Sequence, residues 1–334
     1  MSAIQTISFI LVGNYILEIR GMEWRYFLIL FTAACWANLI GLNISAGFNS
    51  IVTIYVLVPL ILVPQLLFSG VVIDFHNMNN KIKTEKYVPI IGDVITSRWA
   101  YEALMVTQFK DNKFEKEFFD HETRISNALF IKSYIIPELR NISNECLSNI
   151  ENKKDYDQTN RYFKVIRNEL RKLGKYTGEN PSKIFPKLKL EEYSQSVNDE
   201  IHGFLNRSEI FALNRYRKTS DEKDKQFEQL NKKIGGIDYF VDFKQKYFNK
   251  KIASIVLNEG EIFEYNISND EIVRLKDPVF TYPDSKIGRA QYYAPVKKLG
   301  IFTIDTFWFN ILRIWLAFGA VVLQGKCLFV PWAI

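Results

Sequence analysis

Residues 26–73 read YFLILFTAACWANLIGLNISAGFNSIVTIYVLVPLILVPQLLFSGVVI, a stretch of 48 residues with no Asp, Glu, Lys or Arg. The whole chain is 24% charged, so this stretch differs sharply from the rest. A transmembrane α-helix needs about 20 apolar residues, which leaves room here for two crossings and a turn. The small and polar residues 43–50 in the middle predict that turn. We therefore expect an integral membrane protein.

The charges are concentrated in one part of the chain. Of the 43 Lys and Arg, 35 lie between Lys110 and Gly300, and so do 30 of the 37 Asp and Glu. The net charge of that part is 35 minus 30, or +5, and the two signs alternate along it. A nucleic-acid surface needs a patch of one sign, so we expect no nucleic-acid partner.

The apolar segments predict an all-α membrane protein with about four transmembrane helices and a mainly helical soluble insert. The expected spans are residues 3–17, 26–42, 51–73 and 302–324. Pro59 and Pro64 predict a kink in the third span, and Arg313 falls near the middle of the fourth. The expected domains are a membrane region at 1–109, an insert at 110–300 and a last span with its tail at 301–334. Within the insert, residues 261–265 are expected to form a short strand, and residues 277–295 an irregular return to the membrane.

The chain lacks the motifs of an independent enzyme. It has no G-x-x-x-x-G-K-[ST] loop for phosphates and no H-E-x-x-H zinc motif. His76, His121 and His202 are not at metal-ligand spacing. We expect no catalytic residue, no metal and no cofactor on this chain.

Four charged residues follow the third span: Asp74, Asp93, Arg98 and Glu102. One hypothesis makes Asp74 and Asp93 the carboxylate pair of an intramembrane hydrolase. The other makes them markers of the water interface, paired with Arg98.

Several short motifs occur in order along the first third of the chain. They are the small-residue span after FLIL at 27–30, the SAG turn at 45–47, LFSGVV at 67–72, VP at 88–89, SRWAYEAL at 97–104 and QF at 108–109. Together they resemble the C-terminal half of the membrane domain of ABCG-type (white/pleiotropic drug resistance) ABC exporters, in the type-2 permease group.

The resemblance implies positions for the transport path. The spans would be the third to sixth helices of a six-helix half-transporter, and residues 88–109 would dip back into the membrane. The implied substrate path contains Pro59, Leu62, Val63 and Leu66. The implied plug or gate is Phe68, Ser69, Gly70, Val71 and Val72, and the implied re-entrant motif is Arg98, Trp99 and Glu102.

The resemblance also implies partners and a location. Such proteins work as dimers in the lipid bilayer, and they export hydrophobic or amphipathic substrates. ATP and Mg²⁺ would bind a partner ABC ATP-binding domain, so the chain would not be an enzyme on its own. The chain would be a multi-pass protein of the cell membrane, the bacterial inner membrane, with an extracytoplasmic insert.

Three departures from the family pattern stand out. The ATP-binding domain and the first two spans are missing, which favours a fragment or a split gene product. The insert is larger than the usual external loop and resembles bacterial members, while Arg313 and the tail at 325–332 do not match the family. Two other functions stay open: a membrane-anchored binding or sensor protein with a helical ectodomain, and an intramembrane enzyme using Asp74 and Asp93.

Overall fold

The computed structural model describes residues 1–73, 75, 78–79 and 83–329. It divides into two units, each with its own internal contacts. Unit 1 contains residues 1–117, 235–257 and 281–334, and unit 2 contains residues 118–234 and 258–280. Residues 110–117, 235–257 and 281–300 of the expected insert therefore belong to unit 1, with the expected membrane region.

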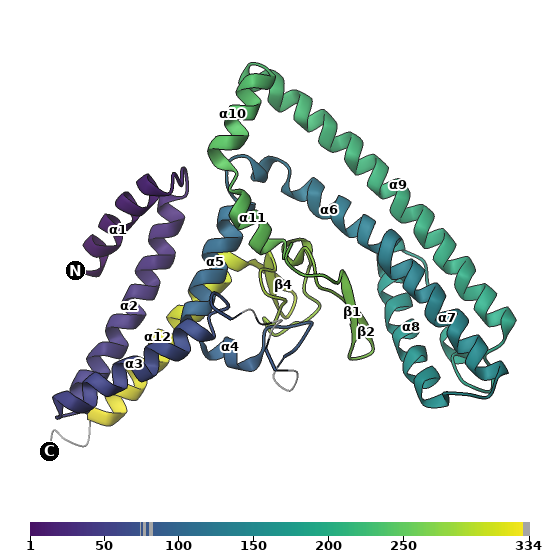
Figure 1. The fold of residues 1–334 in the computed structure, drawn as a ribbon, viewed down its shortest axis with the longest axis horizontal. Helices are drawn as coiled ribbons and strands as arrows, with labels where there is room; N and C mark the ends of the chain where they lie inside the picture. The colour runs from purple at the N-terminus through teal and green to yellow at the C-terminus, as the bar shows by residue number, and fades with distance from the viewer. Residues whose placement is uncertain (74, 76–77, 80–82, 330–334) are drawn as a thin grey trace. The chain divides into compact units, whose positions relative to one another are not determined.

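Unit 1 is built on long apolar helices (Figure 1). Its elements are α1 (Ser2–Ile16), α2 (Glu23–Gly47), α3 (Ile51–Leu67), α4 (Ile90–Val94), α5 (Thr96–Lys110), the 3₁₀ turn η2 (Glu115–Glu117), α10 (Ile237–Tyr247), α11 (Lys250–Val256), strands β3 (Val296–Leu299) and β4 (Phe302–Asp305), and α12 (Thr306–Phe329). Helix α12 packs against α5 and α2, and α1 packs against α2. Strands β3 and β4 form an antiparallel hairpin that leads directly into α12.

The core of unit 1 joins α2, α5 and α12. Ile29, Trp99, Ala103, Phe307 and Ile314 are buried together there. Two ion pairs add to this core: Arg25 of α2 pairs with Asp111, the residue after α5, and Lys110 of α5 pairs with Asp305 of β4. The short helix α5 is thereby held on its apolar face by the core and at its C-terminal end by charge.

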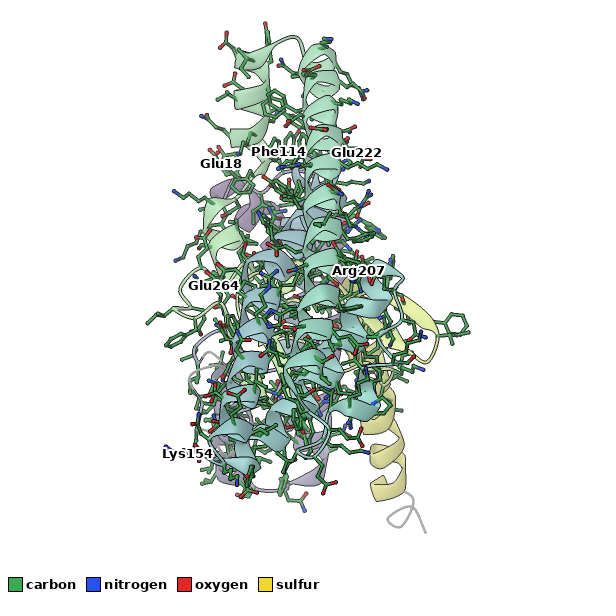
Figure 2. All side chains as sticks on the ribbon, turned by 90° about the vertical axis from the view of Figure 1, so that its right-hand side faces the viewer. Glu18, Phe114, Lys154, Arg207, Glu222 and Glu264 are labelled. Carbon is green, nitrogen blue, oxygen red and sulfur yellow. The ribbon has the colours of Figure 1, made fainter. Side chains whose placement is uncertain are left out.

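Unit 2 is a helical unit with one small hairpin. Its elements are α6 (Phe119–Phe130), the π-helical turn η3 (Ile131–Ile135), α7 (Ile136–Glu151), α8 (Tyr156–Thr177), the 3₁₀ turn η4 (Phe185–Lys187), α9 (Gln195–Ile234), the antiparallel strands β1 (Tyr265–Ser268) and β2 (Glu271–Arg274), and the 3₁₀ turn η5 (Pro278–Phe280). Helix α9 has 40 residues, a length of about 60 Å at 1.5 Å per residue. Its buried residues Val197, Ile201, Phe204 and Leu205 follow helical spacing, and its exposed side carries charged residues such as Arg207 (Figure 2).

The helix boundaries differ from those expected. Helix α2 continues through Asn43 to Gly47, so the turn is limited to residues 48–50. Helix α3 ends at Leu67 rather than at 73. Residues 302–305 form β4, so α12 starts at Thr306 and Arg313 lies about two turns from its start, not near its middle. The strand expected at 261–265 begins only at Tyr265.

Only α2 of the described helices is both long and apolar enough to cross a membrane by length and composition. The apolar helices α1 and α3 are shorter, with 15 and 17 residues. The fold is mostly helical, as expected, with a small β content in two hairpins. That the chain crosses the membrane four times stays a prediction.

Candidate functional site

The residues expected in the substrate path lie on one face of α3. Pro59, Leu62, Val63 and Leu66 recur every three or four positions, the spacing of neighbours on a helix surface. All four are exposed. The same face continues toward the N-terminus of α3 through exposed apolar side chains. Unit 1 therefore presents a continuous apolar helix face that its own described residues do not cover.

The side chain and backbone of Gln65 join α3 to α5. Its Oε1 accepts a hydrogen bond of 3.1 Å from the backbone N–H of Ser97, and its carbonyl oxygen accepts one from the Ser97 hydroxyl. These bonds lie at the start of α5, where backbone N–H groups lack partners within the helix. They place the exposed face of α3 at a defined angle to α5.

The expected plug is a tight turn after α3. Ser69 is buried, and its hydroxyl donates to the carbonyl oxygen of Leu66 at 2.7 Å and accepts from the N–H of Val71 at 3.2 Å. Gly70 has φ +81, a left-handed conformation that glycine adopts without strain. Val71 and Val72 are exposed. The five residues thus form an ordered turn whose apolar end is free of contacts that would bury it.

The expected re-entrant motif lies in a buried ionic cluster. Arg98, Glu102, Lys297 and Asn310 come from α5, β3 and α12, and all are almost completely buried. Nζ of Lys297 lies 2.6 Å from one oxygen of Glu102, and Nδ2 of Asn310 donates to the other at 2.9 Å. Nη2 of Arg98 lies 3.5 Å from that second oxygen. Glu102 is therefore the common acceptor that joins the three elements.

Electrostatics keep Glu102 ionised in this cluster. Burial disfavours the charge of Glu102, and the neighbouring Arg98 and Lys297 favour it. Burial is also the main reason why the pKa of Lys297 is lowered. A buried cluster of this kind is costly to break, because removal of one partner leaves another charge unpaired.

The ring of Trp99 gathers the cations around this cluster. The guanidinium carbon of Arg98 lies 3.8 Å from its centroid, that of Arg313 at 5.4 Å and Nζ of Lys297 at 5.9 Å. An aromatic face attracts cations most strongly where water is excluded. The ring is therefore the partner of Arg313, the charge that the sequence placed inside an apolar helix.

Asp93 lies at the edge of the cluster. Its carboxylate is 3.7 Å from Nη1 of Arg98 and 3.5 Å from Nε of Arg289. The predicted pairing of Asp93 with Arg98 is confirmed. Asp74, the other carboxylate of the hydrolase hypothesis, lies outside the described residues, as does His76. In the described part of the chain, no group of three His, Cys, Asp or Glu could hold a metal ion.

Two members of the cluster were not recognised in the sequence. Lys297 belongs to a short strand, and nothing local distinguishes it from Lys298. The sequence context of Asn310 does predict a buried polar contact, because a polar residue inside an apolar segment needs a partner. Its carboxamide also donates to the carbonyl oxygen of Trp99 at 2.9 Å.

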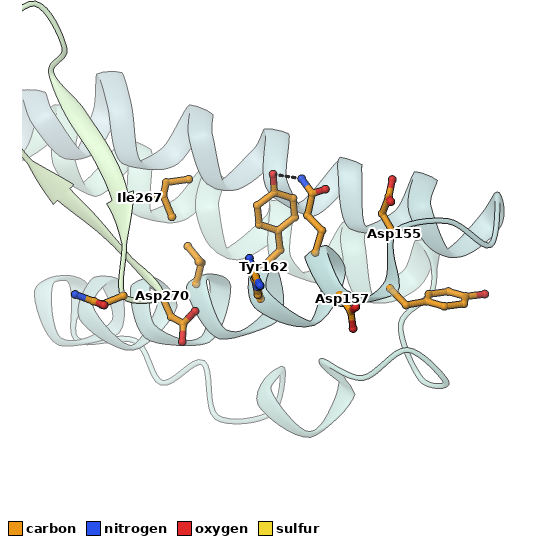
Figure 3. A pocket seen from close by; sticks show the side chains of 10 residues that line it. Asp155, Asp157, Tyr162, Ile267 and Asp270 are labelled. Atoms are coloured by element: carbon orange, nitrogen blue, oxygen red, sulfur yellow. Dashed lines mark hydrogen bonds between the residues drawn. The ribbon is translucent and has the colours of Figure 1, made fainter. Parts of the chain in front are cut away.

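Unit 2 has a surface pocket of its own at the start of α8 (Figure 3). Its lining comes from the first two turns of α8 and from the β1–β2 hairpin, and includes Asp155, Asp157, Arg161, Tyr162 and Asp270. Gln158 bridges within it to the hydroxyl of Tyr162 at 2.8 Å. The lining mixes acidic, basic and aromatic side chains with the apolar Val165 and Ile267.

Comparison with known families identifies the N-terminal region. Residues 1–109 match the family model described as ABC-2 type transporter. This range covers α1 to α4 and all but the last residue of α5. No curated protein and no solved structure gives a significant match to the chain. The family match supports an ABC permease role and a membrane location, and permease domains of this family generally pair with an ATP-binding partner.

Proposed function

We propose that the chain supplies a permease part of an ATP-driven ABC exporter of the ABCG type. The observation that carries this proposal is the family match over residues 1–109, the region that also contains the uncovered apolar face of α3. ATP and Mg²⁺ bind to a separate ATP-binding domain, and this chain forms the route of the substrate through the membrane. Two copies enclose that route, with the α3 faces turned toward each other.

The substrate in this proposal is hydrophobic or amphipathic. Pro59, Leu62, Val63 and Leu66 offer an apolar helix face and no charged side chain, so binding there relies on apolar surface removed from water. The turn at 68–72 follows this face directly and closes the route at one end. Its ordered backbone and exposed Val71 and Val72 suit a gate that meets its counterpart in the second copy.

The buried cluster has a positioning role in this proposal. Glu102 joins the re-entrant helix α5 to β3 and to α12. Because α5 also holds α3 through Ser97 and Gln65, a movement of the last span reaches the transport face through α5. Such coupling needs packed elements with contiguous contacts, which these residues provide.

The first experiment tests partnership and transport together. The full chain is co-expressed with an ABC ATP-binding protein from the same genome, purified from membranes and assayed for bound partner and ATP hydrolysis. We expect co-purification and raised hydrolysis, together with export of a hydrophobic dye from the cells. Failure of the two proteins to associate would overturn the proposal.

A pair of variants tests the path itself. Leu62→Trp adds bulk to the α3 face and is expected to reduce dye export while leaving assembly intact. Leu11→Trp adds the same bulk to an exposed position of α1 and serves as the control. Equal loss of export in both variants would remove α3 from the path.

Topology is tested by cysteine labelling. Asn160 is exposed on α8 in unit 2, and the proposal places it outside the cell. We expect Asn160→Cys to react with a membrane-impermeant reagent added to intact cells. Labelling only after the cytoplasm is opened would reverse the orientation.

The alternative is a membrane-anchored binding or sensor protein. The observation in its favour is that unit 2 has its own core and the pocket at α8. The two functions differ in their partner: the sensor needs no ATP-binding protein. Signalling or binding that persists in cells without any associated ABC protein would favour the alternative.

A further inference from the structure

The turn of the β3–β4 hairpin exposes large apolar side chains. Ile301 is 90% exposed and Phe302 is 67% exposed. Ile287 pairs with Leu299 at the edge of the hairpin, and both are exposed as well. Four neighbouring apolar side chains at one tip form a patch whose exposure to water is unfavourable.

One face of this hairpin is buried at its base and exposed at its tip. Lys297 pairs with Ile304 at the base, and Leu299 pairs with Phe302 at the tip. Side chains two positions apart lie on the same face of a strand. Lys297 is buried against Glu102, and Ile304 packs on the core of α5 and α12. The base of this hairpin face is therefore covered by α5 and α12, whereas its apolar tip extends beyond them.

The position of the hairpin indicates what covers the tip. Strand β4 ends at Asp305 and α12 begins at Thr306, with no residue between them. The first turns of α12 expose Trp308, Leu312 and Trp315. Figure 2 shows the hairpin projecting to the side of α12. In the proposed function α12 crosses the membrane, and a turn that projects sideways from its start then lies at the surface of the bilayer.

We propose that the tip formed by Leu299, Ile301 and Phe302 is embedded in the interfacial layer of the lipid bilayer beside α12. The apolar side chains reach the boundary between headgroups and acyl chains, as in other interfacial anchors. Lys286, which is exposed next to the tip, lies at the level of the lipid phosphates. The anchor fixes the depth of β3, and thereby of Lys297 in the buried cluster. This inference rests on the proposed function, because it requires α12 to cross the membrane.

The experiment measures contact with lipid directly. The full chain is reconstituted into phosphatidylcholine vesicles whose acyl chains are brominated near the headgroup, and tryptophan emission is compared with that in unbrominated vesicles. Ile301→Trp adds one reporter at the tip, and its emission is obtained by subtracting the wild-type signal. Glu191→Trp adds a reporter at an exposed position of unit 2. Trp308→Phe removes the native reporter at the start of α12.

The expected result is that bromolipid quenches the emission added by Ile301→Trp, whereas aqueous iodide does not. Glu191→Trp is expected to behave in the opposite way. If iodide quenches the Ile301→Trp emission and bromolipid does not, the tip lies in water and the inference is wrong. Protection from both quenchers would show a protein partner at the tip and would also overturn it.

The signal of Trp308 separates this failure from failure of the proposed function. Emission lost in Trp308→Phe is expected to be quenched by bromolipid. If that holds while the tip lies in water, α12 is in the membrane and only the anchor is wrong. If Trp308 is also unquenched by lipid, the membrane crossing of α12 fails, and the permease assignment of the last span fails with it.

Discussion

The hydroxyl of Tyr292 donates a hydrogen bond of 2.7 Å to the carbonyl oxygen of Ser69, across 223 positions of the chain. The same ring lies edge-on to Phe75 at 4.9 Å and near Arg98 at 5.6 Å. Tyr292 therefore connects the turn after α3 to the buried cluster around Glu102. The turn expected to act as a gate and the expected re-entrant motif both contact this one side chain.

The first prediction concerns this hydrogen bond. Tyr292→Phe keeps the ring and removes the hydroxyl, leaving a carbonyl of the turn without its donor. We expect a loss of about 1–2 kcal/mol in unfolding free energy. Thermal unfolding of the purified protein in detergent measures it, with Tyr55→Phe on the exposed face of α3 as control. Equal stability of the two variants would show that the bond contributes nothing.

The second prediction concerns Gly70. A Cβ at this position would lie 2.7 Å from the ring of Tyr292, and the φ of +81 is strained for any other residue. We expect Gly70→Ala to cost more than about 1 kcal/mol. Gly41→Ala is the control, because a Cβ at that position of α2 meets nothing within 4 Å. Similar melting temperatures for both variants would contradict the predicted clash.

The third prediction concerns the buried cluster. Glu102→Gln leaves Lys297 and Arg98 without a full negative charge in a site that excludes water. We expect a loss of about 3–5 kcal/mol, seen as a strong decrease of folded protein in membranes. The double variant Glu102→Gln with Lys297→Met removes the stranded charge as well, and it is expected to recover part of the loss. Double and single variants of equal stability would show that the two residues are not coupled.

The fourth prediction concerns pH in unit 2. Nζ of Lys172 lies 2.7 Å from Glu169 and 2.9 Å from Glu271, and the buried Glu169 also accepts from the N–H of Ile272. Burial opposes the charge of Lys172, but the two carboxylates outweigh it and raise its pKa. A base with a raised pKa in the folded state contributes stability below its unfolded-state pKa of about 10.4 and loses it as the pH rises through the folded value. The protection factors of the β2 amides, which are corrected for the intrinsic rise of exchange with pH, are therefore expected to fall at alkaline pH.

A substitution at Lys172 tests the same site through the change in unfolding free energy as the pH is lowered. Lys172→Gln leaves Glu169 buried without its cation, for an expected loss of about 1–3 kcal/mol near neutral pH. Burial raises the pKa of Glu169, so Glu169 takes up a proton more readily as the pH falls. The cost of Lys172→Gln should shrink in acid. Lys189→Gln, in an exposed pair with Glu192, is the control, and a cost that does not change with pH would contradict the assignment.

The sequence predicted the class of fold well and the ends of its elements less well. The absence of charge over residues 26–73 depends only on composition, and it identifies the apolar helices directly. The turn begins later than the predicted residues 43–50 because Asn43 and Ser45 are weak helix formers, not helix breakers. Both residues remain in α2, which ends at Gly47, just before the polar residues that follow. Phe302–Asp305 was assigned to the last span because its strand depends on pairing with residues 296–299.

Some contacts of the candidate site are also predictable from the sequence, and others are not. Arg98 and Glu102 lie four positions apart on one helix face, so their proximity could be inferred from spacing alone. Lys297 is 195 positions from Glu102, and no local pattern reports such a contact. The place of residues 235–257 in unit 1 is also not predictable from spacing, because it depends on which core the segment joins. Charge and hydropathy do not change at residues 235, 258 or 281 in a way that marks it.

Unit 2 is assembled from two separate pieces of chain, and this has a consequence for its synthesis. Its core includes Ile272, with Tyr265 and Ile267 packed against it, but α6 to α9 are complete at residue 234. The ribosome must therefore make α10 and α11 before the residues that finish this core emerge. A chain that stops before Ile272 would therefore leave the core of unit 2 unfinished, although α6 to α9 were already complete.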